Sequence, residues 1–249
     1  MHVHKPDIDT SRFMLTPKQI ATGYSKRYNT KSISLEQLEK EFNRFEPIDR
    51  SNTVHEKALL ELFPGYLLDD CSDADWQLFL AMGRYDSRSQ TFVTGCYDNQ
   101  PLHFKLISYK LRMQNGIKWK TKAKTSPNST LFIRIYTNSN TIYVIEGHRD
   151  ALTAVLLGLD FIMAPYAGFK FTNPASLLAE VQDRAIVFLV EDKPAFNCMF
   201  KIAQAIKHTT NSIVLTSLEQ GRKADLSDLA MKKNSIKEVL DELKNKEFN

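Results

Sequence analysis

From Thr141 onward, short apolar runs alternate with longer amphipathic stretches, and this alternation constrains the fold more than any other feature. Short apolar runs are typical of strands that are buried on both faces, and helical periodicity separates them here. Strands that alternate with helices predict a parallel sheet covered by helices on both faces, which is an α/β fold. The predicted strands are residues 142–145, 161–164, 185–190 and 212–216, and the predicted helices are residues 150–157, 174–181, 194–206 and 235–244.

The first part of the chain has a different pattern. Helix starts are predicted at Thr16, at Ser34 and at Asp73, another short helix at residues 54–63, and a helix end at Gly83. Strands are predicted at residues 91–94, 103–109 and 130–136, with a turn at 98–99. We therefore expect a helical N-terminal region (1–83), a small basic β-rich subdomain (84–139), and an α/β domain with a C-terminal helix (140–249).

Acidic residues follow the predicted parallel strands, at the sheet edge where ligands bind in open α/β folds. Carboxylates gathered there repel one another unless a cation neutralises them, and oxygen-only ligands favour Mg²⁺ or Mn²⁺. The alternative is that acids at helix starts only stabilise the helix dipole. Glu146 has no such role, because it ends an apolar strand directly before Gly147. The acids are Glu146, Asp150, Glu191, Asp192, Asp225 and Asp228.

A basic stretch precedes the α/β region. Between Asn99 and Ile145 the chain has no Asp or Glu, which indicates a polyanionic partner. On a strand, the alternating lysines of residues 118–124 would share one face, and Tyr109 and Trp119 would stack on bases. A solvated edge strand and packing of the two aromatic residues in the core stay open as alternatives. The basic residues are Lys105, Lys110, Arg112, Lys118, Lys120, Lys122, Lys124 and Arg134.

The composition excludes several classes of protein. The chain has 249 residues, of which 43% are hydrophobic and 25% charged, as is usual for a soluble globular protein. No apolar run approaches the roughly 18 residues of a membrane helix, and the first residues lack the apolar core of a secretory signal. We therefore expect a cytoplasmic protein without a membrane partner. The three cysteines show no Cys-x-x-Cys spacing, which excludes a self-contained zinc ribbon.

The segment Ile145-Glu-Gly-His-Arg-Asp-Ala-Leu-Thr-Ala154 resembles the first motif of Toprim domains, Glu-Gly-x-x-Asp-Ala-Leu. Among Toprim proteins the chain is most similar to the primases, namely bacterial primases and the primase halves of phage and mitochondrial replicative helicases. The resemblance covers residues 84–230 and implies a Toprim-type parallel sheet flanked by helices, preceded by a small mixed α+β subdomain and the helical N-terminal region.

Segments on both sides of this motif carry the same resemblance. The strand with Lys110 and Arg112 is similar to the family's Lys-x-Arg strand, and the segments 118–121 and 129–132 resemble its Lys-rich turn and its Leu-Phe pair. Downstream, Lys223-Ala-Asp-Leu-Ser-Asp228 resembles the Lys-Asp-x-x-Asp stretch that follows the last core strand.

The resemblance also implies roles for individual residues. Glu146 would act in general acid–base chemistry or in positioning the metal, and Asp150 matches the family's next acid. The implied catalytic set is Glu146, Asp150 and Glu191. The implied ligands of Mg²⁺ (or Mn²⁺) are Glu146, Glu191, Asp192 and Asp225. The residues that would bind nucleic acid or nucleotide phosphates are Lys110, Arg112, Lys118, Lys120, Lys122 and Lys223.

The chain departs from the family at the Asp-x-Asp motif that coordinates Mg²⁺. In the equivalent stretch, Glu191 occupies the first Asp position and Lys193 the second, and Phe196 replaces a usual Gly. A cation in place of a ligand costs at least one ion of a two-metal site. A one-metal site, a bulge that brings Asp192 into the site, and a degenerate site all stay open.

The leading hypothesis is a compact DNA primase-like protein without zinc ribbon or helicase segment, a nucleotidyltransferase of the DNA-directed RNA polymerase type. It would make short RNA primers on single-stranded DNA during replication of a phage, plasmid or mobile element, by metal-assisted phosphoryl transfer. Its partners would be the template, ribonucleotides and a replicative helicase. The second hypothesis is a catalytically weakened Toprim protein that acts as a nucleic-acid-binding or replication accessory module. The third is a Toprim nuclease.

Overall fold

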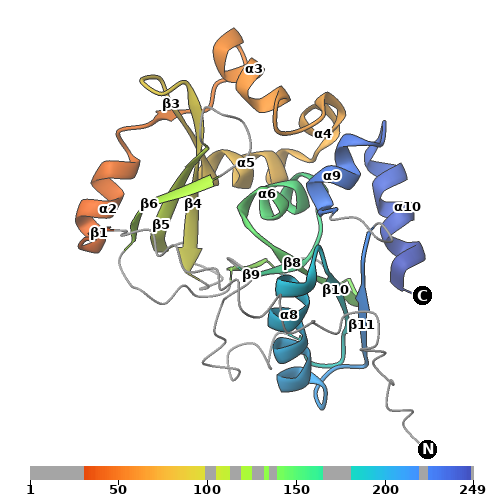
Figure 1. The fold of residues 1–249 in the computed structure, drawn as a ribbon. Helices are drawn as coiled ribbons and strands as arrows, with labels where there is room; N and C mark the ends of the chain where they lie inside the picture. Colours follow the sequence, from red (N-terminus) through yellow and green to blue (C-terminus); the bar gives the residue numbers. More distant parts are fainter. Residues whose placement is uncertain are drawn as a thin grey trace, which may run out of the picture.

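The structure, a computed structural model, describes residues 31–98, 105–112, 119–124, 132–134, 139–164, 181–218 and 224–247. Two sheets and a set of helices make up these residues (Figure 1). The helix start predicted at Thr16, residues 174–180 of the helix predicted at 174–181, and Asn99 of the turn predicted at 98–99 lie outside them. No helix within the described residues is long and apolar enough to cross a membrane.

A five-stranded sheet forms the α/β part, and it confirms the predicted fold class. Its strand order is β11–β10–β8–β9–β7, with four parallel strands and β7 antiparallel to β9. After β8 the chain turns towards β9, and after β10 it turns the opposite way, towards β11. The carboxyl ends of the neighbouring strands β8 and β10 are therefore the topological switch point. The strands are β7 (Phe132–Arg134), β8 (Thr141–Glu146), β9 (Phe161–Ala164), β10 (Ala185–Leu189) and β11 (Ser212–Thr216).

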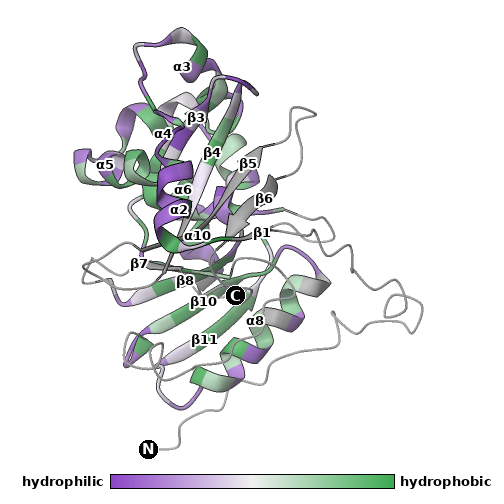
Figure 2. Cartoon of the chain, turned by 90° about the vertical axis from the view of Figure 1, so that its left-hand side faces the viewer, coloured by the Kyte–Doolittle hydropathy of each residue, from purple (hydrophilic) through white to green (hydrophobic). Residues whose placement is uncertain are grey.

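Two apolar cores fill the two faces of this sheet. On β8, Tyr143 and Ile145 belong to one core, whereas Ile142 and Val144 belong to the other, as the alternation of strand side chains requires. Helix α6 (His148–Leu156) packs into the first core, and helix α8 (Lys193–Ile206) packs into the second. Since both faces are covered, the central strands are largely hydrophobic, as the colours of Figure 2 show.

A layer of N-terminal helices continues the first core. In Figure 1, α6 lies between this layer and the sheet, with α9 and α10 beside it. The core is continuous from Ile33 to Leu243, so the N-terminal helices and the α/β part share one set of buried side chains. The helices are α2 (Leu35–Phe42), α3 (Thr53–Leu60), α4 (Gly65–Asp70), α5 (Asp73–Met82), α9 (Leu226–Met231) and α10 (Ile236–Glu247).

Side-chain caps explain where the predicted helices begin. Ser34 caps α2 as predicted, since its hydroxyl accepts the backbone N–H of Gln37 at 3.2 Å. Helix α5 starts at Asp73, but its cap is Ser72 rather than Asp73, because the hydroxyl of Ser72 accepts the N–H of Asp75. Asp73 and Asp75 instead occupy the first turn, where a negative charge stabilises the helix dipole.

A six-stranded sheet lies beside these helices, in the order β1–β6–β5–β4–β3–β2. Strand β1 is parallel to β6, and the other pairs are antiparallel. Strand β7 precedes residue 140 but pairs within the other sheet; the division at 139–140 stays a prediction. The strands are β1 (Lys31–Ser32), β2 (Glu46–Pro47), β3 (Gly83–Asp86), β4 (Thr91–Asp98), β5 (Lys105–Arg112) and β6 (Trp119–Lys124).

Candidate metal centre

Three carboxylates meet at the carboxyl end of the parallel sheet. Asp150 lies in the first turn of α6, after β8; Glu191 follows β10; and Asp225 is the N-cap residue of α9, after β11. Each offers an oxygen atom, and these atoms all lie within 4.8 Å of one another. The group, called here the acidic cluster, therefore sits at the topological switch point, where ligands bind in open α/β sheets.

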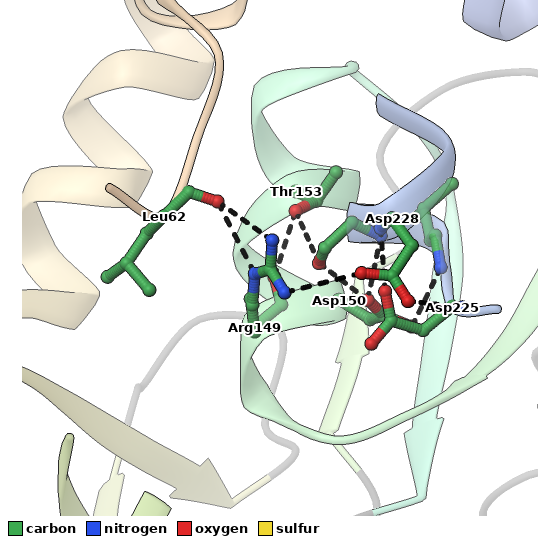
Figure 3. Close-up of polar contacts among 8 residues, drawn as sticks. Leu62, Arg149, Asp150, Thr153, Asp225 and Asp228 are labelled. Carbon is green, nitrogen blue, oxygen red and sulfur yellow. Dashed lines mark hydrogen bonds and ion pairs between the residues drawn. The ribbon is translucent and has the colours of Figure 1, made fainter. Parts of the chain in front are cut away.

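Asp150 is the buried member of the acidic cluster, with 3% of its surface exposed. Its Oδ1 accepts the backbone N–H of Ser227 at 3.0 Å and the Ser227 hydroxyl at 2.6 Å, and its Oδ2 accepts the N–H of Leu226 at 3.1 Å (Figure 3). A carboxylate of α6 thus fixes the first turn of α9. This contact brings Asp225, the residue before that turn, next to Asp150.

The electrostatics of the acidic cluster favour a cation. Burial raises the pKa of Asp150 well above its ordinary value of 3.8, and the charges of Asp225 and Glu191 raise it further. The hydrogen bonds from Ser227 lower it, but they do not outweigh these causes. A divalent cation among the three carboxylates would reverse the sign of this interaction.

The donor set of the acidic cluster fits Mg²⁺ or Mn²⁺. Around octahedral Mg²⁺, with bonds of about 2.1 Å, opposite oxygens lie about 4.2 Å apart and neighbouring oxygens about 3 Å apart. The three carboxylate oxygens, which lie within 4.8 Å of one another, would move closer together to bind one ion. Oδ2 of Asp150 accepts one hydrogen bond, which leaves a lone pair for a metal. The all-carboxylate set also matches the preference of these ions.

Polar contacts lock α9 beside the acidic cluster. The carboxylate of Asp225 accepts the N–H of Asp228 at 2.7 Å, and the carboxylate of Asp228 accepts the N–H of Asp225 at 3.4 Å, which makes a reciprocal capping box. The buried hydroxyls of Ser227 and Thr153 lie 3.0 Å apart. Because α9 is held through its backbone and its cap, the Asp225 side chain has a defined position.

No family model and no curated protein matches the chain. Solved structures do share its fold. The "DnaG catalytic core" aligns with a TM-score of 0.54 and 12% identity, over 85% of this chain and 80% of that one. A DNA primase domain from Pseudomonas aeruginosa aligns at 0.52 and 10%, over 85% and 78%. A DnaG primase catalytic domain bound to single-stranded DNA aligns at 0.53 and 12%, over 85% and 80%. The fold is primase-like.

Within this primase-like fold, Glu146 and Asp192 lie near the acidic cluster in sequence but are not members of it. Glu146 is half-buried and ends β8, next to Gly147, whose φ of 90° and ψ of 164° suit glycine alone. Asp192 caps α8, since its side chain accepts the N–H of Ala195 at 3.0 Å. Their roles as ligand or acid–base group stay predictions.

Four of the residues predicted to bind phosphates lie on the neighbouring strands β5 and β6. Lys110 and Arg112 are on β5, and Lys120 and Lys122 occupy alternate positions of β6, as the strand prediction requires. Lys118 and Lys223 lie outside the described residues. Contact of these residues with nucleic acid stays a prediction.

Three residues beside the acidic cluster, namely Arg149, Thr153 and Ser227, have no role in the predictions from the sequence. Arg149 and Ser227 lie inside the stretches 145–150 and 223–228 that carry the resemblance, but at positions where the family motifs allow any residue. A weak signal exists for Arg149 and Thr153, because residues four apart on a helix lie on one face. The pairing of Ser227 with Asp150 spans 77 positions, and no local pattern predicts it.

Proposed function

We propose that this chain is a Toprim-type primase that makes short RNA primers on a single-stranded DNA template, with Mg²⁺ or Mn²⁺ in the acidic cluster. The observation that carries the proposal is the position of the cluster, since it lies at the switch point of a primase-like fold. One of the similar domains is described as bound to single-stranded DNA, which supports the same partner for this chain.

The chain's own residues would divide the work. Asp150, Glu191 and Asp225 would hold the metal, which supplies positive charge to the phosphates of an incoming ribonucleotide when it is bound. Glu146, at the end of β8, would take the proton of the attacking 3′-hydroxyl or position the metal. The basic residues of β5 and β6 would bind the template and nucleotide phosphates.

The direct test is primer synthesis. The protein is incubated with single-stranded DNA, ribonucleotides and Mg²⁺ or Mn²⁺, and we expect short oligoribonucleotides on a sequencing gel. Asp150→Asn and Glu191→Gln should abolish the product. Asp69→Asn, which changes an exposed carboxylate of α4 far along the chain from the acidic cluster, should retain it. Binding of the template should weaken steeply as salt rises, because lysine–phosphate contacts release counterions.

A second candidate function is that of a nucleic-acid-binding or replication accessory protein. It is favoured by Lys193, which begins α8 where the family has its second Asp, and by the use of Asp192 as a helix cap. This function holds if no primer forms while single-stranded DNA is still bound and Glu146→Gln leaves that binding intact. Cleavage of the template would instead indicate a nuclease.

A further inference from the structure

The guanidinium group of Arg149 joins three elements beside the acidic cluster (Figure 3). Arg149 is the second residue of α6 and precedes Asp150. Its Nε and Nη2 each donate to the carbonyl of Leu62 at 3.3 Å, and its Nη1 lies 3.6 Å from Oδ1 of Asp228. One side chain thus connects α6, the segment after α3, and the first turn of α9.

We propose that Arg149 is a positioning residue, which keeps Asp225 within reach of the metal by holding its capping partner Asp228 against α6. This inference rests on the proposed metal site. The carboxylate of Asp228 binds Arg149 through Oδ1 and the backbone N–H of Asp225 through Oδ2. A displaced Asp228 would therefore release one half of the capping box that orients Asp225.

Through the contact with Leu62, the N-terminal helices also help to position the acidic cluster. Leu62 is buried, with 2% of its surface exposed, and it leads into α4. From α4, the hydroxyl of Tyr66 donates to the carbonyl of Ala230 at 2.8 Å, near the end of α9. The N-terminal layer therefore holds α9 at both ends, through Arg149 at its start and through Tyr66 near its end.

The direction in which the loss of Arg149 changes metal affinity distinguishes a positioning role from a purely electrostatic one. A guanidinium close to a cation site opposes metal binding by Coulomb repulsion. If Arg149 acted through its charge alone, its removal would tighten metal binding. If it positions Asp225, its removal weakens metal binding, and loss of a residue that orients a ligand costs about 10–100-fold in metal affinity.

The experiment is a Mn²⁺ titration of the full chain, in which the free ion is followed by electron paramagnetic resonance. We expect Arg149→Met to weaken Mn²⁺ binding at least about tenfold. Asp228→Asn should weaken it similarly, and the double variant should bind no worse than the weaker single variant, because the two residues act as one unit. The matched control is Arg50→Met. Arg50 makes the same kind of bridge, to the Leu68 carbonyl and the Asp69 carboxylate, away from the acidic cluster.

Each outcome bears on one claim. A wild-type chain that binds no Mn²⁺ contradicts the proposed function itself. If the wild type binds Mn²⁺ and Arg149→Met binds it equally or more tightly, the role of Arg149 is refuted. An equal loss of Mn²⁺ affinity in Arg50→Met also refutes this role, because breaking any arginine bridge in the N-terminal layer would then weaken metal binding. Should Arg149→Met fail to fold, Asp228→Asn breaks the same ion pair from the other side, and unchanged Mn²⁺ binding in that variant overturns the proposal.

Discussion

Substitution of Ser227 by alanine removes one hydrogen bond from the buried carboxylate of Asp150, and the structure gives the size of the effect. Ser227 is 1% exposed, and its hydroxyl lies 2.6 Å from Oδ1 of Asp150, the distance of a charge-assisted bond. Such bonds contribute about 1.5–3 kcal/mol. The two backbone N–H donors to Asp150 remain, and the hydroxyl of Thr153 keeps the Arg149 carbonyl at 3.0 Å. We therefore expect Ser227→Ala to lower the free energy of unfolding by about 1.5–3 kcal/mol.

The assay is urea unfolding at pH 8 in the presence of EDTA, followed by circular dichroism. Ser139→Ala is the control, because its exposed hydroxyl bonds to Thr141, two residues away, and its loss should cost no more than about 0.5 kcal/mol. A Ser227→Ala value as small as that of the control would refute the reasoning. Since the bond from Ser227 lowers the pKa of Asp150, its loss should also move Mn²⁺ binding to higher pH.

Three further predictions concern the frame around the acidic cluster. Phe79→Ala should lower the free energy of unfolding by about 3–5 kcal/mol, because Phe79 is fully buried among three aromatic rings. Circular dichroism should show a single unfolding transition, because the core is continuous. Gly147→Ala should lower the free energy of unfolding, measured with urea, by about 1–3 kcal/mol. The cause would be the φ of +90° alone, since the new Cβ would meet no described atom within 4 Å. Tyr66→Phe should cost about 0.5–1.5 kcal/mol below pH 10. Burial and Glu238 raise the pKa of Tyr66 from 10.0 to about 12, so this contribution is lost as pH rises through 12, which unfolding at a series of pH values will show.

Sequence periodicity predicts the described strands of the parallel sheet because each is buried on both faces and is therefore apolar throughout. It does not predict α9. That helix has only six residues, and its position depends on the distant carboxylate of Asp150 rather than on an apolar face of its own. The strands β1 and β2 are missed for a similar reason, since each has two residues and exists through its pairing partner.

The acids that follow the strands can be found from the sequence, but their grouping cannot. Asp150, Glu191 and Asp225 meet because β8, β10 and β11 are neighbours, and this order is a property of the whole sheet. Asp192 is adjacent to Glu191 in sequence, yet it caps α8. A residue's distance from the strand end therefore does not reveal whether its carboxylate serves a helix or a metal.

The first turn of α8 limits the number of carboxylates that β10 brings to the acidic cluster. Asp192 is used by the N–H of Ala195, and Lys193 begins the helix, so Glu191 alone joins Asp150 and Asp225. Three carboxylates carry at most three negative charges, and one divalent cation offsets two of them. A second ion would need further oxygens, and Mg²⁺ sites commonly take these from substrate phosphates. The departure at Lys193 is thus compatible with phosphoryl transfer, provided that one ion is held by the protein and any other arrives with the nucleotide.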